Sequence, residues 1–288
     1  MRIVVPIKQV PETNAVKMDE ATGTMVREGV EAIINPLDLY AIETALRLRE
    51  TQPEGSCEIV AISMGPPKAA RALREAVAMG LDSAVLISDK AFAGSDTWAT
   101  SYVLAAAIRR LGSTAVSAVI NKNMEDTGET PVLPDMVLCG ERATDGDTGQ
   151  VGPGIASFLD LPVATYVGRL ELVDAKTCRV QRLVEDGHEV LEMELPGVVT
   201  VVKEVADPRL PTLRGKQRAK KIDIPTWGVK ELDVDPAKLG LNGSPTRVVK
   251  IFKPKVTREC EKLKAVDEES VEQAANRVVQ YLREKELL

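Results

Sequence analysis

Residues 137–153 read V-L-C-G-E-R-A-T-D-G-D-T-G-Q-V-G-P, and this stretch decides the interpretation of the whole chain. Its apolar start is typical of a buried strand. Glycines in the following loop allow positive φ angles and let amide groups approach a ligand closely. We expect Asp147 or Thr148 to cap the next helix, whose N-terminus would then suit a phosphate. The stretch predicts a nucleotide-binding loop, with glycines at Gly140, Gly146, Gly149 and Gly152.

The loop differs from the standard phosphate-binding motifs. A Walker loop requires Gly-Lys-Ser/Thr, and residues 137–153 contain no lysine. The Rossmann pattern is half met by Gly152-Pro153-Gly154, with Ser157 in the third glycine position. The Asp145-x-Asp147-x-Gly149 spacing resembles a calcium loop, but the twelfth position is Ala156, which has no carboxylate. A solvated surface turn is the structural alternative.

Composition argues against several classes of function. The chain has 288 residues, 44% of them hydrophobic, which suffices for one large core or two modest cores. A net charge of −6 argues against nucleic acid as a partner, and 3% aromatic residues offer little for base stacking. No apolar run is long enough to span a membrane, and the first apolar segment is too short for a signal peptide. We therefore expect no membrane insertion.

Cysteine and histidine usage argues against metal and histidine-based chemistry. The cysteines at positions 57, 139, 178 and 260 have no C-x-x-C spacing, which is typical of reduced core thiols in a cytoplasmic protein. His188 is the only histidine, and Asp186-Gly187-His188 predicts a turn. We assign no catalytic and no metal-binding residue. Any redox chemistry must therefore come from a cofactor.

Strand and helix patterns alternate through residues 1–160. Strands are expected at residues 3–7, 58–63, 84–87 and 134–139. The first expected helix is capped by Asn35 or Asp38, and the second ends at Gly80. Two further helices are expected at residues 97–111 and 155–159. A small hairpin is expected around Gly23, and a surface excursion at 121–133. The alternation predicts an α/β fold with a mostly parallel sheet and helices on both faces. Ligands bind at the carboxyl ends of such strands, here residues 8–11, 64–67, 92–96 and 140–152.

The pattern changes after residue 162. Residues 163–203 predict a strand meander that extends the sheet, and residues 208–221 form a basic segment whose simplest interpretation is a solvated face. Residues 222–256 lack periodicity and predict an arm on another subunit, in which Trp227 and Leu239 find little core. Ser270-x-x-Gln273 predicts a capping box for a final helix whose apolar stripe is Val271, Ala275, Val278 and Leu282. We divide the chain into a nucleotide-binding domain (1–207), a docking loop and arm (208–265) and a C-terminal helix (266–288).

Several long motifs resemble the beta subunit of electron transfer flavoproteins, in the right order and across essentially the whole chain. The resemblance implies a Rossmann-like domain of the adenine nucleotide alpha hydrolase-like kind. It also implies a heterodimer in which an extended C-terminal arm grips an alpha subunit, and a role in carrying electrons between dehydrogenases and other carriers. The motifs are Val5-Pro6-Ile7-Lys8-Gln9-Val10-Pro11, Asn35-Pro36-Leu37-Asp38, Met64-Gly65-Pro66-Pro67, Asp145-Gly146-Asp147-Thr148-Gly149-Gln150-Val151-Gly152-Pro153 and Arg214-Gly215-Lys216 with Ala219-Lys220-Lys221.

The family divides by the ligand of the beta subunit. Mitochondrial-type members hold AMP as a structural ligand. Electron-bifurcating members hold FAD, which takes a hydride from NADH. One electron then goes to ferredoxin or flavodoxin, and the other goes through the alpha-subunit flavin to a flavin dehydrogenase such as an acyl-CoA or 2-hydroxy acid dehydrogenase. Residues 64–67, 88–97 and 145–153 resemble the bifurcating group. Arg142 stands where the family commonly has glutamine, and a guanidinium there suits a pyrophosphate.

The resemblance also implies which residues bind the cofactor and the partners. It places Leu213 and Arg214 in a loop that docks the partner dehydrogenase. Two alternatives stay open: a subunit that holds AMP alone, and a nucleotide-sensing domain of the universal-stress type, which the basic, proline-broken tail beyond Pro208 disfavours. The implied cofactor residues are Pro6, Ile7, Lys8, Asn35, Pro36, Leu37, Asp38, Met64, Gly65, Phe92, Gly94, Ser95, Asp96, Thr97, Gly140, Glu141, Arg142, Ala143, Thr144, Asp145, Gly146, Asp147, Thr148, Gly149, Gln150 and Val151.

Overall fold

The structure of the protein is a computed structural model that describes residues 1–12, 17–18, 25–26, 32–112, 133–249 and 261–288. It divides into two compact units, Met1–Val249 and Lys250–Leu288.

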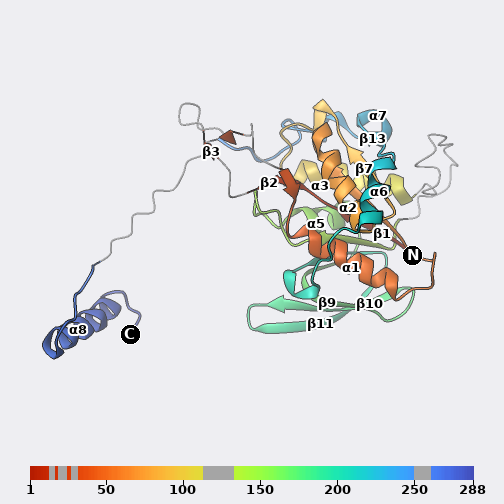
Figure 1. The fold of residues 1–288 in the computed structure, drawn as a ribbon. Helices are drawn as coiled ribbons and strands as arrows, with labels where there is room; N and C mark the ends of the chain where they lie inside the picture. Colours follow the sequence, from red (N-terminus) through yellow and green to blue (C-terminus); the bar gives the residue numbers. More distant parts are fainter. Residues whose placement is uncertain (13–16, 19–24, 27–31, 113–132, 250–260) are drawn as a thin grey trace. The chain divides into compact units, whose positions relative to one another are not determined.

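A nine-stranded sheet forms the centre of the first unit, in the order β11-β10-β9-β12-β8-β1-β6-β7-β13 (Figure 1). All neighbours from β9 to β13 in this order are parallel, and β10 and β11 are antiparallel. The predicted mostly parallel sheet is thus confirmed. Its strands are β1 (Arg2–Pro6), β6 (Glu58–Met64), β7 (Ser83–Ile87), β8 (Met136–Gly140), β9 (Val163–Leu172), β10 (Thr177–Val184), β11 (Gly187–Glu194), β12 (Gly197–Val201) and β13 (Thr226–Trp227).

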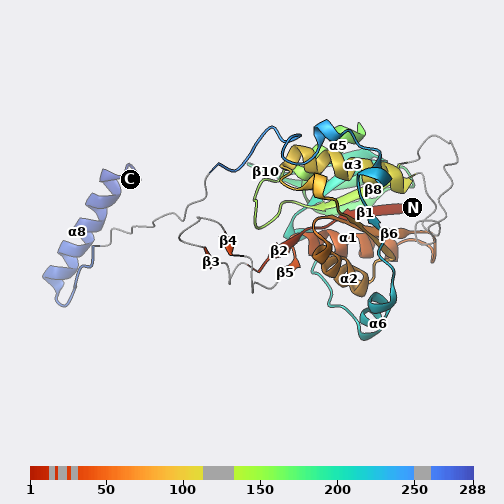
Figure 2. The same cartoon turned by 90° about the horizontal axis from the view of Figure 1, so that it is seen from above.

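Helices cover both faces of this sheet, as predicted (Figure 2). The apolar side chains of α1 and α2 belong to one core cluster, and those of α3 and α5 belong to a second cluster on the other face. Alternate residues of the strands supply the two clusters, as Val4 and Val5 of β1 illustrate. The helices are α1 (Asp38–Glu50), α2 (Ala70–Met79), α3 (Thr97–Gly112), α5 (Val151–Leu159), α6 (Leu213–Lys221) and α7 (Val229–Leu232), with short 3-10 turns at Pro67–Ala69, Lys90–Phe92, Lys203–Val205 and Pro236–Lys238.

Local signals place most elements correctly, with two corrections at helix starts. Gly80, at φ 134°, ends α2 as predicted, because a residue with a side chain rarely adopts that angle. The cap prediction for α1 is wrong, since Leu37 holds the cap position and no side chain caps the helix. Helix α5 begins at Val151, before the predicted residue 155.

The segment from β9 to β12 only partly follows the predicted meander. Strands β9, β10 and β11 do run antiparallel in sequence at one end of the sheet. Strand β12 instead returns between β9 and β8, parallel to both. His188 is the second residue of β11, opposite Leu183, and does not lie in the turn. A pattern of alternating residues predicts a strand but not its neighbour, which is why the error arises here.

Residues 222–240 supply buried side chains to the core of the first unit, contrary to the expectation of an uncovered arm. Strand β13 adds to the sheet beside β7, and Trp227 is only 4% exposed. Leu239 is buried in the same cluster as α3 and α5. The same lack of core was expected for Leu241, Val248, Val249 and Phe252, and the first three are exposed as expected.

Two short strand pairs lie outside the main sheet in the described residues. β2 (Gln9–Pro11) pairs with β5 (Ala32–Ile34), and the expected hairpin is present as β3 (Lys17–Met18) with β4 (Met25–Val26). In the second unit, α8 (Glu268–Glu284) has no buried residue, and Asp267 with Ser270 forms its capping box, three residues before the predicted one. Gly23, Phe252, Cys260 and nearly all of the predicted surface excursion at 121–133 lie outside the described residues.

Candidate functional site

The carboxyl edge of the parallel strands brings together the segments predicted to bind a nucleotide. Residues that follow β1, β6, β7 and β8 meet there, because all four strands run in the same direction. Strand β13 is also parallel to β7, so the chain after Trp227 arrives at the same edge. Sequence reasoning missed this last segment, since two residues are too short for a strand pattern.

Asn35 joins this edge to the nucleotide loop. Its side chain is fully buried, and Nδ2 donates to Asp38 Oδ1 and to the carbonyl of Arg142, both at 2.9 Å. Its Oδ1 accepts from the Thr144 amide at 3.1 Å. Both Nδ2 protons are thus used inside the protein. Asn35 therefore positions the loop, and we do not expect it to touch the ligand through Nδ2.

Asp38 is the buried acid of the site. Its Oδ2 accepts from the Lys8 amide at 2.7 Å, and its side chain packs against the start of the loop at Gly140. Burial raises the pKa of Asp38 to about 7, although the hydrogen bonds from Lys8 and Asn35 act in the opposite direction. The carboxyl group is therefore placed to titrate near neutral pH.

Partly exposed ion pairs hold the charged residues of the loop. Lys8 Nζ lies 2.7 Å from Asp145 Oδ1. Arg142 Nε lies 3.0 Å from Asp147 Oδ1 and 3.2 Å from Glu141 Oε1. Neither aspartate caps α5, whose N-terminus has no side-chain cap, so the predicted cap by Asp147 or Thr148 is wrong. The first amides of α5 thus carry no capping side chain, as an anion site requires.

The loop glycines differ in the space around them. A Cβ at Gly140 would lie 2.5 Å from Asp38 Oδ1 and 2.7 Å from the Leu37 carbonyl, and one at Gly152 would lie 2.5 Å from Thr200 Cγ2. A Cβ at Gly146 would have nothing within 4 Å. Gly149 has φ 64°, which favours glycine. Gly140 and Gly152 are therefore required for packing, whereas Gly146 borders open space.

The segment after β7 is only partly available to a ligand. Phe92 is 5% exposed and belongs to the core. The Asp96 carboxylate is used inside the protein: Oδ1 accepts from the Ala99 amide at 3.0 Å, and Oδ2 accepts from Thr246. Burial acts to raise the pKa of Asp96, but these hydrogen bonds hold it below its usual range. Gly94, Ser95 and Thr97 remain in contact with solvent.

Tyr166 is a residue at this edge that sequence reasoning missed. It lies in a β-bulge, where β9 has one residue more than β12 between the pairs Val199–Ala164 and Val201–Val167. Its φ is 57°, which is uncommon for an aromatic residue, and its ring is near Gly149, whose Cβ would lie 3.6 Å from Tyr166 Oη. The strand pattern contains no signal for a bulge, so only the structure places this phenol beside the loop.

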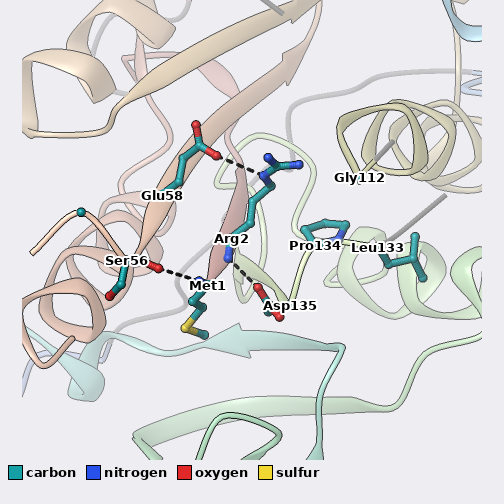
Figure 3. Close-up of a pocket in the computed structure, with 9 residues that line it drawn as sticks. Met1, Arg2, Ser56, Glu58, Gly112, Leu133, Pro134 and Asp135 are labelled. Carbon is teal, nitrogen blue, oxygen red and sulfur yellow. Dashed lines mark hydrogen bonds and ion pairs between the residues drawn. The ribbon is translucent and has the colours of Figure 1, made fainter. Parts of the chain in front are cut away.

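A recess at the opposite, amino-terminal edge is a different feature (Figure 3). Arg2 pairs there with Glu58 at 3.1 Å, and its amide donates to Asp135 at 2.6 Å. The Met1 amino group donates to the Ser56 carbonyl at 2.6 Å. None of the residues that line this recess in the described part of the chain is a predicted site residue.

The described cysteines are buried, and they lie apart from any cluster of metal-ligand side chains in the described ranges. Cys57, Cys139 and Cys178 are buried free thiols, and burial raises the pKa of Cys178 to about 11. Within the described ranges, no group of three or more His, Cys, Asp or Glu side chains is arranged to hold a metal ion. The same ranges contain no helix long and apolar enough to cross a membrane.

The predicted docking residues lie on a surface away from the loop. Leu213 begins α6 and is 82% exposed, and Arg214 follows it. Arg209 fixes the chain just before α6, with Nε 2.8 Å from Glu43 Oε2 and Nη1 2.6 Å from Glu50 Oε1, both on α1. Although burial acts in the opposite direction, the hydrogen bonds from Arg209 lower the pKa of Glu43. The ion pairs of Arg209 with Glu43 and Glu50 thus hold the chain just before the exposed Leu213.

Comparison with known proteins decides the family. The model of the electron transfer flavoprotein domain matches residues 22–232. The chain belongs to the electron transfer flavoprotein family. This confirms the resemblance inferred from the motifs.

Relatives over the whole length agree with this assignment. The caffeyl-CoA reductase-Etf complex subunit CarD of Acetobacterium woodii is 42% identical over 288 residues, which is 100% of both chains. The electron transfer flavoprotein subunit beta of Clostridium acetobutylicum is 41% identical over 285 residues, 99% of each chain. Protein FixA of Azorhizobium caulinodans is 40% identical over 262 residues, 90% of this chain and 86% of FixA. The similarity therefore includes proteins named as beta subunits.

Proposed function

We propose that this chain is the beta subunit of a heterodimeric electron transfer flavoprotein and binds FAD at the carboxyl edge of its sheet. A flavin bound there would supply the chemistry, accepting a hydride from NADH and releasing its two electrons separately. Ferredoxin or flavodoxin would take one electron, and the alpha-subunit flavin would carry the other to a partner dehydrogenase. The alternative is a subunit that holds AMP as a structural ligand.

The geometry of the nucleotide loop is the observation that carries this proposal. Asn35 fixes the loop against α1, so its backbone is held in place before a ligand arrives. Helix α5 has no side-chain cap, and the space beside Gly146 is open. Backbone amides and an uncapped helix N-terminus suit phosphate groups. The residues present thus fit a nucleotide with one phosphate or two.

The charges around the loop also suit a phosphate. Lys8 and Arg142 are paired with Asp145 and Asp147. The Lys8 and Asp145 side chains are 48% and 26% exposed, and those of Arg142 and Asp147 are 46% and 72% exposed. Exposed ion pairs of this kind contribute only about 0–1 kcal/mol, so both cations are able to exchange a carboxylate for a phosphate. Arg142 would then bind a pyrophosphate oxygen in place of Asp147.

The choice of FAD over AMP rests on motif resemblance and on one relative. Residues 64–67, 88–97 and 145–153 resemble the bifurcating group, and CarD, by its name, belongs to a caffeyl-CoA reductase-Etf complex. The names of the other relatives do not separate the two ligands. We infer a cytoplasmic location from the buried free thiols alone.

Two surfaces are proposed for protein partners. Leu213, with Arg214 beside it, would dock the partner dehydrogenase. An exposed leucine next to a chain segment held by the ion pairs of Arg209 is a suitable anchor. The chain beyond Thr246 would lie on the alpha subunit. Helix α8 supports this second assignment, since Val271 and Val278 are each 53% exposed in a helix with no buried residue.

Cofactor content of the purified heterodimer tests the proposal. Denaturation should release two FAD and no AMP per heterodimer, whereas one FAD with one AMP would establish the structural-ligand alternative. Gly149→Trp should expel the beta-subunit dinucleotide and abolish NADH oxidation while the alpha-subunit flavin stays bound. Gly149→Asn is the matched control, because asparagine tolerates the φ of 64° without filling the ligand path.

A further inference from the structure

Residues 239–246, here called the strap, lie directly on the loop formed by residues 91–97. Gly240 has φ 55°, and a Cβ there would lie 2.8 Å from the Ala93 carbonyl. A Cβ on Gly94 would meet Leu241 Cβ at 3.3 Å. The two backbones therefore approach so closely that only glycine fits at Gly240, although the segments are about 150 residues apart in the sequence.

One carboxylate fastens the far end of the strap. Asp96 Oδ2 accepts from the Thr246 amide at 2.9 Å and from Thr246 Oγ1 at 2.8 Å. The Asp96 amide donates to Ser244 Oγ at 2.8 Å, and Ser244 Oγ donates to the Gly240 carbonyl at 2.6 Å. Because Asp96 Oδ1 also caps α3 through the Ala99 amide, the strap, the loop and the start of α3 share one charged hydrogen-bond acceptor.

The strap beyond Leu239 adds nothing to the hydrophobic core. Leu239 is 3% exposed and ends the apolar packing, whereas Leu241 is 56% exposed. From Leu241 to Thr246 the described contacts with the loop are polar, apart from the approach of Leu241 to Gly94. A segment held mainly by polar bonds to one loop stabilises that loop's conformation more than it stabilises the fold.

We propose that Thr246 and Ser244 are positioning residues: they hold the loop of residues 91–97 in the conformation that receives the nicotinamide end of NADH. The inference rests on the proposed function, in which a flavin at this edge of the sheet takes a hydride from NADH, so that the nicotinamide must reach the same edge. It adds that the binding site depends on residues far along the chain that do not touch the ligand.

Three variants of the heterodimer test the proposal. Thr246→Val removes the hydroxyl donor at nearly constant volume and keeps the amide. Thr246→Ser keeps both donors and should behave as the natural protein does. Thr226→Val is the matched control, because Thr226 is exposed on β13 and lies outside the strap.

The first measurement is hydrogen exchange without NADH. In Thr246→Val, the amides of Ala99 and of residue 246 should exchange about tenfold faster, which is the effect expected for losing one hydrogen bond to a carboxylate. Unchanged exchange would overturn the proposal, because the hydroxyl would then not hold the loop.

The second measurement is NADH-dependent flavin reduction. KM for NADH should rise about tenfold in Thr246→Val with kcat changed less than twofold, and Thr246→Ser and Thr226→Val should keep the natural KM. Faster exchange with an unchanged KM would show a purely structural strap and overturn the proposal. If the natural heterodimer does not oxidise NADH, the proposed function fails and this inference fails with it. If instead the natural heterodimer oxidises NADH and Thr246→Val has the same KM, only this inference fails and the proposed function stands.

Discussion

Gly140 and Gly146 lie in the same loop, and alanine at these two positions should have opposite consequences. Neither has a positive φ, so the substitution strains neither backbone. They differ only in the space for a Cβ. At Gly140 the new atom would lie 2.5 Å from Asp38 Oδ1 and 2.7 Å from the Leu37 carbonyl, whereas at Gly146 it would meet nothing within 4 Å.

The magnitude follows from what would have to move. The Leu37 carbonyl is backbone at the start of α1, and Asp38 is held by Lys8 and Asn35, so neither neighbour has a free rotation away. Overpacking of this kind costs about 3 kcal/mol. Gly146→Ala should change the free energy of unfolding by less than about 0.5 kcal/mol, or stabilise the protein slightly by reducing the freedom of the unfolded chain.

Urea denaturation of the heterodimer, together with its cofactor content, measures both effects. With a denaturant slope of about 3 kcal/mol per molar, Gly140→Ala should lower the midpoint by about 1 M relative to Gly146→Ala. Gly140→Ala should also release the beta-subunit nucleotide, because the loop can no longer pack on α1. Equal midpoints and equal nucleotide contents for the two variants would refute the packing argument.

Three further predictions concern other parts of the molecule. The pKa of Asp38 is raised from 3.8 to about 7, so protonation of this carboxyl group contributes about 4 kcal/mol to stability. That contribution is full below pH 4 and is lost as pH rises through 7. Carboxyl NMR titration checks this, and a midpoint near 4 would contradict it. Leu213→Ala should slow electron delivery to limiting dehydrogenase about 30-fold without flavin loss, and unchanged transfer kinetics would count against docking there. Trp227→Ala should cost about 3–5 kcal/mol in urea unfolding, whereas an uncovered arm would predict almost none.

Local sequence patterns predicted the frame of the fold and which segments meet at the carboxyl edge of its sheet. Apolar runs mark β1 and β6, and Gly80 marks the end of α2, because a strand, a helix and a left-handed turn each depend on a few adjacent residues. Parallel strands require that their following loops meet at one edge. The glycine loop after β8 was therefore identified as the candidate site from sequence alone.

Contacts between distant residues were decided only by the tertiary structure. Asn35 was predicted as a helix cap or ligand contact, but it bonds Arg142 and Thr144 across more than 100 residues. For Asp96, a predicted cofactor residue, the sequence contains no sign that its carboxylate accepts from Thr246. Periodicity reports which face of an element is apolar and contains no information on which distant donor reaches a given carboxylate. That information comes from the path of the chain. Because the two-residue strand β13 pairs with β7, the strap that follows it lies at the same edge of the sheet as the loop of residues 91–97.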